Sequence, residues 1–155
     1  MSNRKNSLIK NYKSITVFVM SFLYVFIGVK HFLDPQYFIN ITPPQIEYKS
    51  FAVYFTGVLE VAGGLLILNK KTRKMGAHTL IFLLIIVFPA NIYLYLCETP
   101  QQLLGISEAQ ALTRMPFQAP LILLAYWHSK ENHPKWVDYL SVIVFLPTII
   151  YFVSI

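Results

Sequence analysis

The stretch FAVYFTGVLEVAGGLLIL, residues 51–68, decides the fold of this chain. A helix of that length and apolarity is about 27 Å long at about 1.5 Å per residue, enough to cross the hydrocarbon core of a bilayer. Glu60 lies close to its middle. A carboxylate at that depth costs a few kcal/mol on insertion scales, so it needs polar partners or must stay neutral. The stretch therefore predicts a membrane helix with a polar site at its centre.

The composition of the whole chain agrees with a membrane protein. Of its 155 residues 55% are hydrophobic and 13% are charged, and the mean hydropathy is +0.52. Soluble domains carry about 25% charged residues. The apolar residues also come in long blocks, which is typical of membrane-spanning helices. We expect one small all-α bundle and no second domain.

The apolar blocks predict a transmembrane four-helix bundle with an additional C-terminal apolar helix. Residues 1–14 form a basic N-terminal tail, residues 15–128 hold the four-span bundle, and residues 136–155 form the additional helix. This last run contains Asp138 and Pro147, so it spans the membrane or lies at its interface, and spanning is the favoured reading. The expected helices cover residues 15–33, 51–68, 75–96, 114–127 and 136–155.

The connections carry their own signals. Asp34-Pro35 ends the first helix, because the residue before a proline avoids the helical region. The linker of residues 35–49 is apolar and rich in proline, which suggests a lid over the mouth of the bundle. Ser50 is a candidate N-cap of the second helix. Residues 107–110 (SEAQ) fit a capping box that starts a short helix before the fourth segment.

The positive charge is a topology signal. The net charge is +6, and lysines and arginines concentrate in the N-terminal tail and in residues 69–74, with two more in residues 129–135. The first and third loops carry one each. The positive-inside rule then places the N-terminus in the cytoplasm of a multi-pass protein of the inner membrane. Nucleic acid is not an expected partner. The first apolar run is long and lacks a small-x-small cleavage pattern, so we expect it to remain as a span.

Sparse polar residues in four different segments are expected to meet in one outward-facing pocket. By their depth along the helices they all fall in the outer half of the membrane, where independent placement would scatter them. Gly57 and Gly64 lie on the same helical face as Glu60 and leave room for a neighbour or a ligand. The predicted ligand-binding residues are His31, Glu60, Asn91, Arg114 and Gln118.

Each of these residues also has a purely structural interpretation. Glu60 and Arg114 could form an ion pair that holds the bundle together. His31 could bond to the first linker or be oriented by Asp34, Asn91 could satisfy the carbonyl freed by Pro89, and Gln118 could join two helices. These alternatives remain open at the level of sequence.

Other chemistries have little support. Cys97 is the single cysteine, so relay chemistry between two cysteines is excluded within this chain. His31 and Glu60 would supply only two ligands, so no metal site is expected. His31 and His78 fall at opposite ends of the membrane and do not suit a haem. No catalytic residue and no cofactor is assigned.

Four short motifs occur in a recognisable order: GVKHFLDP at residues 28–35, GVLEVAGG at 57–64, FPAN at 88–91 and RMPFQ at 114–118. This series resembles the DoxX-like family of small four-helix integral membrane proteins over roughly residues 15–128. The family is named for a subunit of a thiosulfate:quinone oxidoreductase, and other members look like partners of redox or stress-response proteins. Residues 136–155 lie beyond the usual four-span pattern.

The sequence thus leads to one principal functional hypothesis and two rivals. The principal hypothesis is a membrane subunit of a redox system, whose pocket binds a small molecule such as a quinone head group. Arg114 and a protonated His31 would donate hydrogen bonds there, and Glu60 would exchange a proton. The rivals are a non-enzymatic assembly or partner protein with a structural polar cluster, and a small transporter that would need to form a homo-oligomer.

Overall fold

The computed structural model describes residues 2–154, with the surroundings of the side chains of residues 7–152. These residues form helices and connecting turns, which confirms the all-α fold class. The helices are α1 (Ser2–Leu33), α2 (Pro35–Asn40), α3 (Lys49–Leu68), α4 (Arg73–Leu96), α5 (Glu98–Leu104), α6 (Glu108–Ser129) and α7 (Lys135–Ser154).

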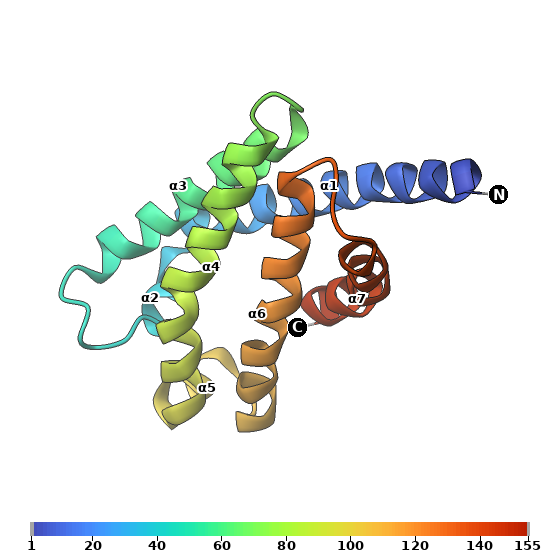
Figure 1. Cartoon of the computed structure of the whole chain (residues 1–155). Coiled ribbons are helices and arrows are strands. Elements are labelled where there is room, and N and C mark those ends of the chain that lie inside the picture. Colours follow the sequence, from blue (N-terminus) through green and yellow to red (C-terminus); the bar gives the residue numbers. More distant parts are fainter. Residues whose placement is uncertain (1, 155) are drawn as a thin grey trace.

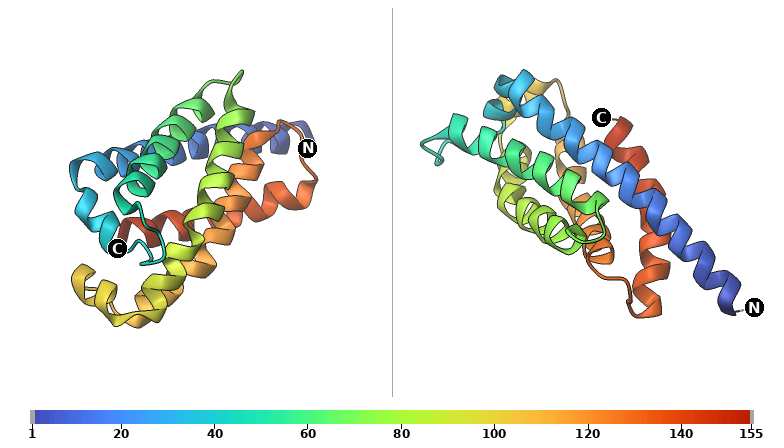
Figure 2. Two further views of the ribbon diagram at one scale, coloured as in Figure 1. Left: turned by 90° about the vertical axis from the view of Figure 1, so that its left-hand side faces the viewer. Right: turned by 90° about the horizontal axis from the view of Figure 1, so that it is seen from above.

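Each of the five long helices packs on the one before it, and α3, α4 and α6 run in alternating directions with α1 lying across them (Figure 1). The last helix, α7, contacts the N-terminal half of the first helix, α1 (Figure 2). There the ring of Tyr12 meets Phe145 edge-on, with 5.8 Å between the ring centroids. The short helices α2 and α5 lie at the same end of the bundle and contact each other. This end is the one expected to face outward.

Four helices are long and apolar enough to cross a membrane, namely α1 over Ser7–Leu33, α3, α4 and α7 over Lys135–Phe152. Many of their large apolar side chains, such as Phe22, Phe51 and Ile143, are exposed on the outside of the bundle. Such a surface suits lipid rather than water. The helix α6 is not among these four, although it is long and contributes many core residues. Its first turns carry Glu108, Gln110 and Arg114, which lower its hydropathy.

Several boundaries differ from the expectations. The helix α1 begins at Ser2, so the described part of the basic tail continues the first helix instead of preceding it. The N-cap of α3 is Tyr48 and not Ser50. The capping box is confirmed, because the Ser107 hydroxyl accepts from the Gln110 backbone and the Gln110 side chain accepts from the Ser107 backbone. It starts a single helix, α6, that continues through Arg114 without a break.

The end of the bundle opposite α2 is held by polar bonds between α1, α6 and α7. The Trp127 indole donates a 2.7 Å hydrogen bond to Asp138 at the start of α7. The Thr16 hydroxyl and the His128 ring lie 3.0 Å apart, also fully inside the bundle. Trp127 is completely buried, so it is a core residue of the bundle.

Candidate functional site

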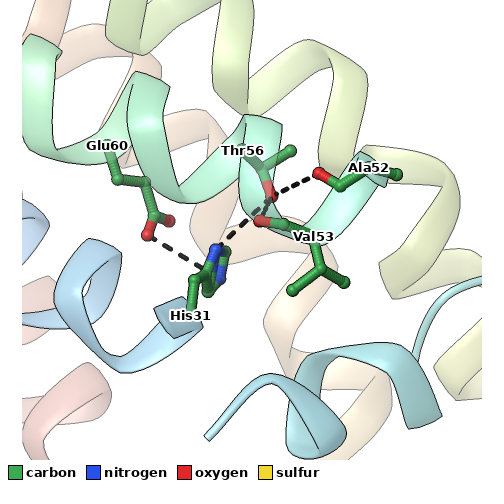
Figure 3. A network of polar contacts seen from close by, with 5 residues as sticks. All are labelled: His31, Ala52, Val53, Thr56 and Glu60. Atoms are coloured by element: carbon green, nitrogen blue, oxygen red, sulfur yellow. Dashed lines mark hydrogen bonds and ion pairs between the residues drawn. The ribbon is translucent and has the colours of Figure 1, made fainter. Parts of the chain in front are cut away.

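Glu60 faces His31 where α3 crosses the C-terminal end of α1 (Figure 3). The carboxylate oxygen Oε2 lies 3.8 Å from Nε2 of the imidazole, and the two side chains keep only 12% and 6% of their exposure. This distance is too long for a direct hydrogen bond. The two groups therefore face each other across a narrow gap inside the protein.

Two glycines bring the helices close enough for this contact. A Cβ atom on Gly28 of α1 would lie 2.9 Å from Cβ of Glu60, and one on Gly57 of α3 would lie 2.7 Å from Cβ of His31. Neither distance leaves room for a side chain. Further along the interface, the Ser21 hydroxyl donates a 2.7 Å bond to the carbonyl of Gly64. Small residues thus set the spacing of α1 and α3, as is common between membrane helices.

The hydrogen bonds of Thr56 favour one tautomer of the His31 imidazole. The Thr56 hydroxyl has one proton, and it lies 3.0 Å from the carbonyl oxygens of both Ala52 and Val53 (Figure 3). If the hydroxyl donates to its own helix, it can only accept from Nδ1 of His31, which is 3.4 Å away. The protonated nitrogen is then Nδ1, and Nε2 faces Glu60.

Two protonation states of the pair of Nε2 and the Glu60 carboxylate are electrically neutral overall. Either Glu60 is a neutral acid beside a neutral imidazole, or Glu60 is ionised beside an imidazolium. Burial favours such neutral states over a single unpaired charge. In each of them one of the two groups can donate a hydrogen bond to a third group.

Two buried oxygen atoms at this site have no hydrogen-bond partner among the described residues, Oε2 of Glu60 and the hydroxyl of Tyr24. Tyr24 is 7% exposed and lies two helical turns before His31 on the same face of α1. It precedes Gly28, whose Cβ position adjoins Glu60, by four residues, so it lies on the face of α1 that packs against α3. Buried polar groups are normally paired, so each unpaired one requires an explanation.

The short helix α2 covers the outer side of His31. The Phe38 ring packs against the imidazole with 3.6 Å between the ring centroids. The neighbouring Tyr37 hydroxyl accepts a 3.4 Å hydrogen bond from Arg114 of α6. The expected lid over the bundle mouth therefore takes the form of a helix, and it stands between Arg114 and the imidazole.

The five residues predicted to line one pocket occupy different interfaces. Only His31 and Glu60 meet, and among the described residues no ion pair joins Glu60 to Arg114. Gln118 is buried and donates a 3.2 Å bond to the Leu84 carbonyl, so it joins α6 to α4. Asn91 is half-buried on α4, and its amide has no hydrogen-bond partner within the described part of the chain.

Three neighbours of the pair were missed at the level of sequence, namely Tyr24, Phe38 and Thr56. Helical spacing offered a signal for two of them, because Tyr24 precedes His31 by seven residues and Thr56 precedes Glu60 by four. The expected helper Asp34 is exposed at the break between α1 and α2, and Thr56 takes the place beside Nδ1. Among the described residues, no three His, Cys, Asp or Glu side chains cluster closely enough to hold a metal ion.

The comparison with protein families gives one match. The model of the family described as Domain of unknown function (DUF8561) matches residues 20–129, from the middle of α1 to the end of α6. No curated protein and no solved structure matches the chain significantly. Because the matched stretch covers most of the sequence, the chain belongs to the DUF8561 family.

Proposed function

We propose that this member of the DUF8561 family is a membrane protein that binds the head group of a small molecule between α1 and α3 and exchanges a proton with it. The observation that carries the proposal is the buried oxygen Oε2 of Glu60, which faces His31 and has no hydrogen-bond partner among the described residues. A ligand with a hydrogen-bonding head group would satisfy it. Such a ligand would thereby offset the cost of leaving a buried group unpaired, which is about 1–3 kcal/mol.

The distances favour an oxygen atom as the bound group. An atom placed beside the 3.8 Å gap could lie about 2.8 Å from both Oε2 and Nε2, an ordinary hydrogen-bond distance. A carbonyl oxygen there would accept a hydrogen bond from whichever of Glu60 and His31 carries the proton, and a hydroxyl would donate one to the other group. A quinone head group presents such oxygens, as a carbonyl or as a hydroxyl.

An apolar tail would find a suitable surface next to the same site. Phe32 of α1 and Tyr54 of α3 stack at 5.7 Å on the outer surface of the helix pair, and both rings are exposed. Phe32 also approaches the position that a Cβ of Gly57 would take, so the aromatic pair adjoins the polar gap. A head group between the helices with its tail along these rings is the expected binding mode of a quinone.

The DoxX-like resemblance of the four motifs extends this proposal to a cellular role. The chain would act as the membrane subunit of a redox system, with a redox enzyme as its partner. In this role His31 and Glu60 would serve the ligand directly. Arg114 would act indirectly, by holding α2 over the imidazole through Tyr37.

The test is the identity of the small molecules that leave the membrane with the protein. The protein is extracted with its surrounding lipid by a styrene–maleic acid polymer, and bound quinones and lipids are measured by mass spectrometry. Glu60→Gln should lower the co-purified quinone at least tenfold relative to total lipid. The control Glu98→Gln removes an exposed carboxylate of α5 and should retain the wild-type amount. Equal quinone with both variants, or none with the wild type, would exclude this ligand at this site.

The rival proposal is that the chain is an assembly protein, and one observation favours it. The glycines Gly28 and Gly57 pack the helices so closely that the His31–Glu60 contact could serve only to hold α1 against α3. In that case Glu60→Gln should lower stability while no small molecule is lost. Thermal unfolding of the same purified samples separates the two proposals.

The orientation of the chain is part of the proposal. We infer from the lysine and arginine distribution that the N-terminus and the turn between α3 and α4 face the cytoplasm of a bacterial inner membrane. Single cysteines at Lys70 and Gln45, with Cys97 replaced by alanine, test this on intact cells. A membrane-impermeant maleimide should label Gln45→Cys and leave Lys70→Cys unlabelled until the cells are broken. The reverse pattern would invert the topology.

A further inference from the structure

An open groove runs along the outer surface of α3 and α4, away from the His31–Glu60 site. Its volume is about 660 Å³. The end near the turn between the helices is lined by Lys71, Lys74 and Met75. His78 and Thr79 follow one turn farther along α4, and Leu59 and Phe82 line the deeper end. The groove is therefore cationic at the end of the hairpin and apolar toward the middle of the helices.

The change from a cationic to an apolar lining has the same direction as the change from head groups to acyl chains in one lipid leaflet. Lys74 and Phe82 are eight residues apart on α4, which corresponds to about 12 Å along the helix axis. Both helices are long and apolar enough to cross a membrane, so the deep end would lie among acyl chains and the other end at the head groups. Met75 and Phe82 remain 58% and 51% exposed on this surface.

The basic turn contains cations with different roles. Arg73 is committed to the fold, because its guanidinium donates to the last carbonyls of α3, at 2.8 Å to Ile67 and 3.1 Å to Leu68. Thr72 donates to the carbonyl of Leu66 in the same way. The ammonium groups of Lys71 and Lys74 have no hydrogen bond or ion pair to any described residue. The turn keeps its shape without them, and they are free to bind something else.

We propose that this groove is a binding site for an anionic phospholipid. The phosphate would sit between the ammonium groups of Lys71 and Lys74, and one acyl chain would lie along Met75 and Phe82. His78 donates from Nδ1 to the carbonyl of Lys74, at 2.6 Å, so Nε2 of a neutral imidazole would accept from a head-group hydroxyl and not bind the phosphate. Free phosphate would use the cationic end alone, whereas a phospholipid matches both ends of the groove.

The proposal is independent of the proposed ligand between α1 and α3. It uses none of the residues of that site and depends only on the position of the α3–α4 hairpin in a bilayer. A failure of either experiment leaves the other proposal standing. A lipid held here would anchor the cytoplasmic end of the hairpin in the proposed orientation, where the leaflet is negatively charged.

Native mass spectrometry of the purified full chain in a mild detergent tests the site. Phosphatidylglycerol is titrated against the protein, with phosphatidylcholine of the same acyl chains as the reference. Each lysine near an anionic head group contributes about fivefold to binding. The double variant Lys71→Gln/Lys74→Gln should therefore bind phosphatidylglycerol roughly 25-fold more weakly and phosphatidylcholine without change.

A control variant with the same change in net charge distinguishes a specific lipid site from general electrostatic attraction. Lys70→Gln/Lys135→Gln removes the same charge from the same end of the bundle, but neither residue lines the groove. This variant should bind phosphatidylglycerol as the wild type does. An equal loss in both double variants, or equal affinity of the wild type for both lipids, would refute the site.

The apolar end is tested by a second pair of variants. Phe82→Ala removes a groove side chain, and Ile85→Ala removes an equally exposed side chain of α4 that lies outside the groove. Only Phe82→Ala should weaken phosphatidylglycerol binding, by about fivefold. Displacement of the lipid by millimolar glycerol phosphate, together with no effect of Phe82→Ala, would mean that the site binds a free phosphate and not a phospholipid.

Discussion

Replacing Gly57 by alanine tests whether the close approach of α1 and α3 builds the site. The added Cβ would lie 2.7 Å from Cβ of His31 and 3.1 Å from both Nδ1 of His31 and Cε2 of Phe32. Carbon atoms pack at about 3.5 Å or more, so the shortest contact is about 0.8 Å too close. A Cβ atom cannot rotate away, because it is fixed to its backbone. The helices must therefore move apart.

Two opposing effects decide the sign of the result. Alanine has a higher helix propensity than glycine by about 1 kcal/mol. Overpacking a well-filled interface costs about 1–3 kcal/mol. Membrane helices stay largely helical when they dissociate. Most of the gain in helix propensity therefore applies equally to the folded and the dissociated state and cancels. We expect Gly57→Ala to lower the free energy of unfolding by about 1–2 kcal/mol.

The matched control is Gly63→Ala, the same substitution on the same helix. Its Cβ would meet the Leu80 side chain, at 2.6 Å from Cδ2 and 2.9 Å from Cγ, and no backbone atom or Cβ of the neighbouring helix lies as close. A leucine side chain beyond its Cβ can change rotamer, so a smaller loss is expected than for a contact with a Cβ. Unfolding by sodium dodecyl sulfate in dodecyl maltoside micelles, followed by the fluorescence of the buried Trp127, measures both variants. A Gly57→Ala protein that is more stable than the wild type would refute the tight α1–α3 contact.

Two further predictions concern the other polar contacts of the bundle. Trp127→Phe should lower the free energy of unfolding by about 1.5–3 kcal/mol, measured in the same assay by circular dichroism, because it removes the hydrogen bond to the Asp138 carboxylate. The control Trp136→Phe changes an exposed tryptophan and should lower it by under about 0.5 kcal/mol. Equal effects of the two variants would contradict the role of the indole. Ser21→Ala should cost about 0.6 kcal/mol through loss of the bond to the Gly64 carbonyl, a typical value between membrane helices, and a loss near zero would show that this bond is replaced.

The long helices could be predicted from the sequence because each of them satisfies its own backbone. In lipid no water is available for exposed N–H and C=O groups, so an apolar run of sufficient length must be helical. The expected segments 51–68 and 75–96 accordingly differ from α3 and α4 by two residues at one end. The capping box at Ser107 was equally local, since both of its hydrogen bonds join residues three positions apart.

The short helices could not be predicted in this way. The helices α2 and α5 have six and seven residues, too few to be stable alone. Their conformation depends on what they pack against, and Phe38 of α2 rests on His31. Ser50 has the side chain of a good N-cap, yet α3 begins earlier, at Lys49.

For the site, too, the sequence predicted one property of the residues and not another. A residue's place in a span indicates its depth, and depth alone made His31, Asn91, Arg114 and Gln118 equally good partners for Glu60. Depth does not specify which helices are neighbours or how each is rotated about its axis. The family match and the number of apolar segments leave that question open as well.

The sequence by itself determined that this chain is an all-α protein with helices long and apolar enough to cross a membrane, and with a carboxylate near the middle of one of them, because length, apolarity and capping act within a few residues. Only the tertiary structure decided that Glu60 faces His31, that Arg114 turns to Tyr37, and that Trp127 is a core residue. The physical reason is the spacing of the helices. The glycines Gly28 and Gly57 let α1 and α3 approach until their polar side chains meet, and that contact depends on both helices together.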